Sequence, residues 1–210
     1  MIQVLAVNVG KPVVILERRG DVVLSGIGKQ RLPAGPITVG LTNIVGDQQA
    51  DLFNHGGPDK AVYVYPSENL QFWKDEIGYE GGDSSFGENL TTAGVTETDS
   101  CIGDIWRWGE VTLQISQPRW PCFKLAFRTG HMDMVRRFVA SGRSGWYMRV
   151  LEPGVTSEDS PIERIGRDPA GITVHDSFQA AINRTSLTEA ERAHHVSHPA
   201  LSQAWREILS

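Results

Sequence analysis

The most reactive side chain that the sequence offers is the thiol of Cys122. Pro118 and Pro121 stiffen the backbone on either side of Arg119 and so restrict where the thiol can point. Arg119 and Lys124 bring positive charge near the sulfur, which favours a thiolate, and a thiolate is both a nucleophile and a ligand for soft metals. The residues alone leave open the alternative of a buried structural cysteine.

The second thiol, Cys101, follows Asp99 and Ser100 and has no basic neighbour, so we expect it to be structural. Two cysteines do not make a disulfide framework, and they supply too few ligands for structural zinc unless histidines join them. This cysteine usage predicts a cytoplasmic protein.

A glycine-rich segment before a predicted strand is suited to an anionic ligand such as phosphate. Gly56 and Gly57 allow backbone amides to approach a ligand closely, while His55 and Lys60 add polar, cationic groups beside them. The same residues are equally compatible with a glycine-rich turn whose charged side chains are only solvated.

Two further segments carry weaker signals of the same kind. Gly87 precedes Glu88 and Asn89, which combines close backbone approach with amide and carboxylate recognition. Arg143 and Arg149 flank a short run of small and aromatic residues, and either guanidinium could hold a phosphate in bidentate fashion. The alternatives are a turn leading into a strand and a loop with surface arginines.

Elements that position these residues are predicted from short apolar runs separated by turn residues. The predicted strands span residues 4–7, 13–16, 22–24, 37–41, 61–65, 111–116 and 146–151. Apolar residues at spacings of three and four predict helices over 66–77 and 133–140. Because strands and helices do not alternate regularly, we expect a mainly β, α+β fold with a bent, mostly antiparallel barrel-like sheet.

The character of the sequence changes after residue 154. A polar, acidic stretch at 155–160 resembles a linker, and amphipathic patterns then predict three short helices at 173–183, 188–196 and 199–209. Three such helices cannot each bury an apolar face alone, so we expect them to pack together. The predicted domains are therefore a β-rich unit at 1–155 and a three-helix unit at 156–210.

Composition excludes several broad classes. Of the 210 residues, 40% are apolar and 21% are charged, which is typical of a globular protein with a real core. With 20 Lys and Arg against 25 Asp and Glu, the net charge of −5 argues against a general nucleic-acid binder. No apolar run approaches the roughly 18 residues that span a bilayer, so no membrane association is expected.

Taken in order, these motifs resemble the MOSC domain, a module related to the C-terminal part of molybdenum-cofactor sulfurases. The resemblance is carried by residues 47–51, 55–63, 86–90, 118–122 and 144–147, and it is strongest to the YiiM-type subgroup, in which three helices follow the domain. It implies a β-barrel-like fold and a molybdenum atom held by a pterin dithiolene, with Cys122 as its protein ligand and catalytic residue. It also implies reduction of N-hydroxylated compounds such as 6-N-hydroxylaminopurine.

The resemblance also suggests which residues bind the pterin cofactor and which partners are needed. The expected cofactor-binding residues are His55, Gly56, Gly57, Lys60, Gly87, Glu88, Asn89, Arg119, Arg143 and Arg149. The chain has neither the cysteines for an iron–sulfur cluster nor a flavin fingerprint, so electrons must come from a separate reductase.

Two questions stay open at the level of sequence. The same ligands would serve a carrier that holds the cofactor, or a persulfide on Cys122, without catalysis. The last helices carry both signs of charge and show no basic face, so we expect them to dock on the barrel, on a reductase or on a second subunit, which would make a homodimer.

Overall fold

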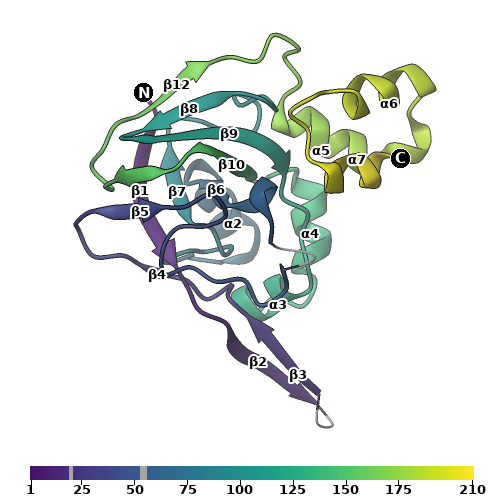
Figure 1. Cartoon of the computed structure of the whole chain (residues 1–210). Helices are drawn as coiled ribbons and strands as arrows, with labels where there is room; N and C mark the ends of the chain where they lie inside the picture. Colours follow the sequence, from purple (N-terminus) through teal and green to yellow (C-terminus); the bar gives the residue numbers. More distant parts are fainter. Residues whose placement is uncertain (19–20, 53–55) are drawn as a thin grey trace.

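The chain folds into a mixed α+β structure around one strongly curled sheet of eight strands (Figure 1). The computed structural model describes residues 1–18, 21–52 and 56–210. In spatial order the sheet contains β12 (Ile162–Gly166), β8 (Ile105–Trp108), β9 (Val111–Pro118), β10 (Trp146–Glu152), β6 (Val62–Pro66), β7 (Leu90–Ala93), β1 (Gln3–Val9) and β4 (Gln30–Arg31). All neighbours pair antiparallel except β6 and β7. The predicted α+β class is confirmed.

Strand β9 shows how the sequence pattern works and where it falls short. Its apolar residues Val111, Leu113 and Ile115 are fully buried, as their alternation predicts. The opposite face, however, is not exposed to solvent, because Ser116 is also fully buried. Its hydroxyl donates hydrogen bonds to the carbonyls of Asp59 (2.6 Å) and Tyr147 (3.0 Å). A second layer therefore covers the polar side of this strand.

The parallel pair β6 and β7 is joined by helix α2 (Glu68–Ile77), which is the crossover that parallel strands require. Helix α2 ends as predicted at Gly78, whose φ of 67° suits glycine. Pro66 does not begin this helix but ends β6. Helices α3 (Lys124–Thr129) and α4 (Met134–Ser141) follow β9, and α3 had no sequence signal of its own.

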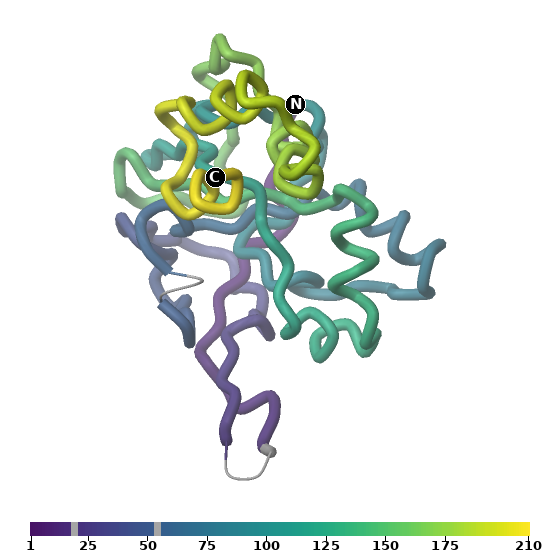
Figure 2. The backbone as a smooth tube through the Cα atoms, turned by 90° about the vertical axis from the view of Figure 1, so that its right-hand side faces the viewer, coloured from purple at the N-terminus to yellow at the C-terminus, as the bar shows by residue number. Residues whose placement is uncertain are grey.

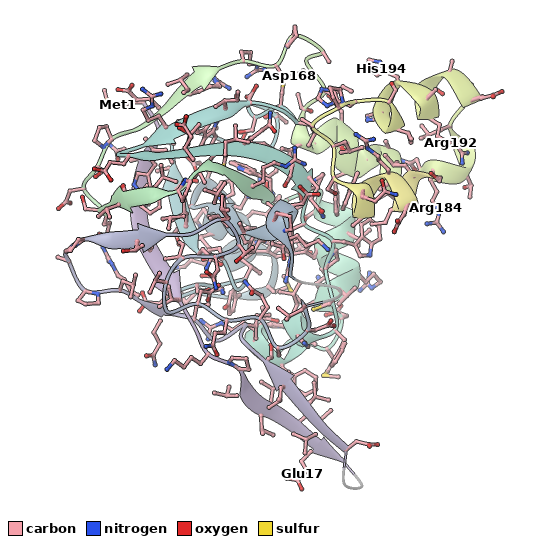
Figure 3. The ribbon with its side chains drawn as sticks, viewed as in Figure 1. Met1, Glu17, Asp168, Arg184, Arg192 and His194 are labelled. Atoms are coloured by element: carbon pink, nitrogen blue, oxygen red, sulfur yellow. The ribbon has the colours of Figure 1, made fainter. Side chains whose placement is uncertain are left out.

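Two small strand pairs complete the β structure. Strands β5 (Ile37–Val39) and β11 (Gly154–Thr156) pair with each other. Strands β2 (Val13–Arg18) and β3 (Asp21–Ser25) form a ribbon that projects from the body, with Glu17 near its tip (Figure 3). No helix in the described ranges is long and apolar enough to cross a membrane.

Helices α5 (Val174–Ile182), α6 (Glu189–Val196) and α7 (Gln203–Leu209) lie at the end of the molecule opposite the β2–β3 ribbon (Figure 2). Thr173 and Thr188 start α5 and α6 with capping boxes, which explains why their predicted boundaries hold. Phe178 and Trp205 are fully buried in the same cluster as Ile115 of the sheet. These helices therefore extend the core of the β-rich part rather than forming a core of their own.

The sheet continues past the predicted boundary at residue 155. Strand β12 pairs with β8, so the expected linker at 155–160 leads into a strand of the main sheet. The reason is that β12 buries Ile162 but exposes Glu163 and Ile165, which leaves no alternating apolar pattern to detect.

Candidate functional site

A cleft opens where several loops meet the ends of β6 and β10. Its empty space amounts to about 570 Å³, part of which is open to solvent. The residues that line it are Ser25, Gly26, Ile27, Lys29, Gln48, Gln49, Ala50, Asp51, Lys60, Tyr63, Phe86, Gly87, Asn89, Arg119, Cys122, Lys124 and Tyr147. Segments far apart in the sequence therefore contribute to one surface.

Cys122 lies in the wall of this cleft, in the short connection between β9 and α3. Its side chain is half-buried, and its carbonyl accepts a hydrogen bond from the Leu125 amide (3.1 Å) at the start of α3. Cys101, in contrast, is fully buried and does not line the cleft. Cys122 is thus the one thiol of this chain that a bound molecule in the cleft could reach.

Arg119 is a buried cation in the same wall. Only 4% of it is exposed, and its guanidinium carbon lies 5.2 Å from the ring centre of Tyr63 and 5.3 Å from that of Phe138. Burial disfavours its charge, but interactions with Tyr63, Tyr147 and Cys122 outweigh burial and raise the pKa of Arg119. Its Nη1 atom has no hydrogen-bond partner among the residues described. A buried charged donor without an acceptor is costly, which favours an anionic group beside it.

Lys29 is the second buried cation, but its charge is compensated. It forms an ion pair with Asp47, whose carboxylate also accepts from the Gly10 amide and from Asn89 Nδ2, both at 2.9 Å. Burial lowers the pKa of Lys29, while Asp47 opposes that shift. Asn89 in turn accepts from the Tyr63 amide (3.0 Å), so this network fixes the wall that faces Cys122.

Lys60 enters the cleft from the short 3₁₀ helix η1 (Pro58–Lys60). Partial burial lowers the pKa of Lys60, against the effects of Asp59 and Asp51. Helix η1 is held from behind by Arg149, which pairs with Asp59 (2.8 Å) and also donates to Gln114 Oε1 (2.9 Å). Arg149 therefore does not line the cleft but positions the turn that carries Lys60.

Gly87 and Glu88 have different roles in the loop before β7. The φ of Gly87 is 87°, and a Cβ there would lie 2.8 Å from Ile27 Cγ1, so glycine lets the loop approach the opposite wall. Glu88 is buried and accepts from the amides of Ser85 (2.9 Å) and Phe86 (2.8 Å). Burial raises the pKa of Glu88 although these donors oppose it. Glu88 thus shapes the loop and does not face the cleft.

Arg143 lies away from the cleft, contrary to the sequence expectation. It donates to Asn69 Oδ1 (2.8 Å), and its guanidinium carbon lies 4.4 Å from the ring centre of Phe72. Asn69 also donates to the buried carboxylate of Glu97 (2.9 Å), which accepts from the Gly145 amide (2.7 Å). Arg143 therefore belongs to a network that joins α2 to the start of β10.

Gly56 and Gly57 do not line the cleft, and the local backbone explains why glycine stands at both positions. A Cβ on Gly56 would lie 2.7 Å from the carbonyl oxygen of Leu52, and Gly57 begins η1 with a φ of 94°. His55 lies outside the described residues. Of the expected cofactor-binding residues, those that the structure brings together in the cleft are Lys60, Gly87, Asn89 and Arg119, beside Cys122.

Sequence reasoning did not select Lys29, Tyr63 or Tyr147, all of which line the cleft. Lys29 follows Gly26 and Gly28, but that segment fits neither nucleotide-binding fingerprint, so its lysine had no pattern to support it. Tyr63 and Tyr147 sit on predicted strands, where an aromatic residue is typical of core. The available signal was their place inside the motif residues 55–63 and 144–147.

Comparison with known proteins places this site in a family. Residues 51–163 match the MOSC domain. YflK of Bacillus subtilis, described as uncharacterized, is 44% identical over 206 residues, covering 97% of this chain and 90% of YflK. The chain belongs to the MOSC family. The crystal structure of YiiM from Geobacillus stearothermophilus matches it over the full length of both chains, with a TM-score of 0.82 and 34% identity, so this is a YiiM-type MOSC protein.

A third relative shows the MOSC unit inside a longer protein. A protein of Gibberella moniliformis named "Reductase" is 35% identical over 172 residues, which covers 75% of this chain but only 30% of that protein. Cys122 and the lining residues from Asp51 to Tyr147 fall inside the matched residues 51–163, whereas the lining residues from Ser25 to Ala50 precede them.

Proposed function

We propose that this MOSC protein binds the molybdenum cofactor in the Cys122 cleft and reduces N-hydroxylated compounds such as 6-N-hydroxylaminopurine. The observation that carries the proposal is the pairing, in one cleft wall, of an accessible thiol with the buried Arg119, whose Nη1 has no acceptor among the described residues. A thiol can ligate a soft metal, and an unsatisfied buried cation calls for an anion.

The cleft residues fit the chemistry of the cofactor, which is an anionic pterin that carries a phosphate and a dithiolene. Lys60, Lys124 and Arg119 line the cleft together with the carboxylate of Asp51. Lys29 also lines it, but its charge is balanced by Asp47 behind the wall. Cys122 would be the protein ligand of the metal, and the lysines would hold the phosphate. When bound, the cofactor would supply the two-electron chemistry that no side chain of this protein can perform.

Two tyrosines, Tyr63 and Tyr147, line the cleft together with Cys122. Reduction of R–NHOH to R–NH2 and water consumes two electrons and two protons. Burial raises the pKa of both Tyr63 and Tyr147, so both phenols are protonated at neutral pH. Tyr63 donates to the Ser144 carbonyl (3.0 Å), while Tyr147 accepts from Arg119 and lines the cleft.

A reductase partner is part of the proposal. The relative named "Reductase" supports an oxidoreductase role, because there the MOSC-like stretch is one part of a longer protein. We infer that in the present case a separate protein delivers the electrons.

The test is turnover by protein produced in a host that makes the cofactor. With a chemical electron donor, we expect 6-N-hydroxylaminopurine to be converted to its amine with two electrons consumed per product. Protein that is fully loaded with molybdenum but produces no amine would contradict the reductase role. Transfer of the cofactor from that protein to a cofactor-free acceptor enzyme would then identify a carrier.

A further inference from the structure

The three C-terminal helices contact the segment that carries Cys122 through an aromatic cluster. The ring centre of Trp120 lies 5.6 Å from that of Phe178 in α5 and 5.9 Å from that of Trp205 in α7. Phe178 and Trp205 are fully buried and stack on each other at 6.2 Å, whereas Trp120 is 39% exposed. Trp120 is therefore the outer member of a cluster whose inner members belong to the helices.

Hydrogen bonds join the same helices to the strand that leads into this segment. Ser202 Oγ donates to Gln117 Oε1 (2.7 Å), and the Ser202 amide donates to the Ser116 carbonyl (3.0 Å). Ser202 also caps α7, since its hydroxyl accepts from the Trp205 amide (3.1 Å). The start of α7 is thereby fixed to the end of β9, just before Arg119.

Contact reaches the cleft from a second direction as well. Arg149, which holds the η1 turn through Asp59, also donates to the Ala200 carbonyl (2.8 Å) in the segment before α7. The negative charge of Glu207 in α7 raises the pKa of Lys60 and so favours its charged form, against the effect of burial. The helices therefore contact the η1 turn that carries Lys60 and, more directly, the segment that carries Cys122.

We propose that the C-terminal helices are a brace for the cleft, with Trp120 as the positioning residue that holds the Cys122 segment. Pro118 and Pro121 limit the backbone around Trp120 to few conformations, and docking of its ring against Phe178 and Trp205 selects one of them. The inference rests on the proposed function only in taking Cys122 as the working residue of the cleft.

The experiment measures how fast iodoacetamide alkylates Cys122 in native protein without cofactor, by mass spectrometry of the two cysteine peptides. Trp120→Ala removes two aromatic contacts and is expected to raise the Cys122 rate about tenfold. Trp120→Phe keeps a ring in place and is expected to stay within about twofold of the unchanged protein. Cys101, which is fully buried, serves as the internal reference for opening of the whole fold.

Two more variants keep the test decisive. Phe178→Leu weakens the cluster from the helix side and should also raise the alkylation rate of Cys122. This variant tests the brace if Trp120→Ala fails to fold. Phe127→Ala is the matched control, because Phe127 is 41% exposed, lies on α3 and packs beside Phe123 at 6.2 Å; its Cys122 rate should not change.

An unchanged or slower Cys122 rate in folded Trp120→Ala and Phe178→Leu would overturn the brace. So would a parallel rise at Cys101, because that would show general loosening rather than release of one segment. Since the measurement needs no molybdenum, its failure leaves the proposed reduction untouched, and protein that binds no molybdenum leaves the brace untouched.

Discussion

Each of the two cysteines lies near a buried charged side chain, but the two regions differ in how that charge is balanced. Beside Cys101, the buried carboxylate of Asp104 accepts from the Cys101 amide (3.1 Å) and pairs with Arg164 at 3.2 Å. Beside Cys122, the buried Arg119 has no carboxylate within ion-pair distance among the described residues, and one of its nitrogens lacks any partner. One region is electrostatically complete within the chain, and the other is not.

The same difference separates the structural thiol of Cys101 from the thiol of Cys122, which we propose is the functional one. Burial raises the pKa of Cys101, and the charge of Asp104 raises it further, so its sulfur stays a neutral core atom. Cys122 lies at the surface of a cleft next to an unsatisfied cation. Under the proposed function, the anionic cofactor supplies the acceptor that Arg119 lacks.

The largest effect is expected on removing each thiol in turn. Cys122→Ala should lower molybdenum-dependent reduction at least about 100-fold, because the metal loses its protein ligand. Cys101→Ala should leave turnover within about twofold, since that sulfur does not touch the cleft. Steady-state rates per folded protein measure both. Loss of turnover in Cys101→Ala with full activity in Cys122→Ala would reverse the assignment.

The second largest effect is expected on replacing the arginines of the two regions. Arg119→Met keeps the apolar contacts but removes the unsatisfied cation, so cofactor retention should fall about tenfold or more. Arg164→Met removes a cation that Asp104 already neutralises and should leave retention unchanged. Molybdenum per folded protein after gel filtration is the measurement. Equal losses in both variants would mean that Arg119 acts only through the fold.

The free energy of unfolding, in contrast to turnover, should depend strongly on the region around Cys101. Asp104→Ala leaves the Cys101 and Asp168 amides without their acceptor and should cost about 3 kcal/mol of unfolding free energy. Urea denaturation measures this cost, with turnover per folded protein expected to stay unchanged. A cost below about 1 kcal/mol would show that Asp104 does not hold this region together.

The smallest effect is expected at the edge of the cleft. Lys60→Gln removes one half-buried cation among several and should weaken cofactor retention about threefold to tenfold, while the rate per bound molybdenum stays the same. Arg143→Gln is the matched control, because Arg143 contacts Asn69 and Phe72 outside the cleft. Equal effects of the two substitutions would remove Lys60 from the site.

Local sequence patterns predicted those parts of the fold that depend on neighbouring residues. Apolar stripes predicted the last helices, and the stripe residues Leu201, Trp205 and Leu209 are all buried. The capping boxes of Thr173 and Thr188 explain why the predicted starts of α5 and α6 agree with the structure. Strand β12 escaped prediction because its place depends on pairing with β8, more than 50 residues earlier.

The candidate site divides in the same way. Cys122 and Arg119 were selected because prolines and charges next to them carry a signal, and both line the cleft. Arg149 was selected as well but lies behind the η1 turn, because its partner Asp59 is 90 residues away and no local pattern distinguishes an arginine that supports a turn from one that faces a ligand. Tyr63 and Tyr147 join the cleft only through the pairing of β6 with β10.

Elemental analysis of molybdenum in protein from a cofactor-producing host, with and without Cys122, shows whether this thiol anchors the metal. The unchanged protein should carry about one molybdenum per chain, and Cys122→Ala should carry far less while its circular dichroism stays the same. Equal molybdenum in both proteins would contradict the assignment of Cys122 as the ligand that anchors the metal.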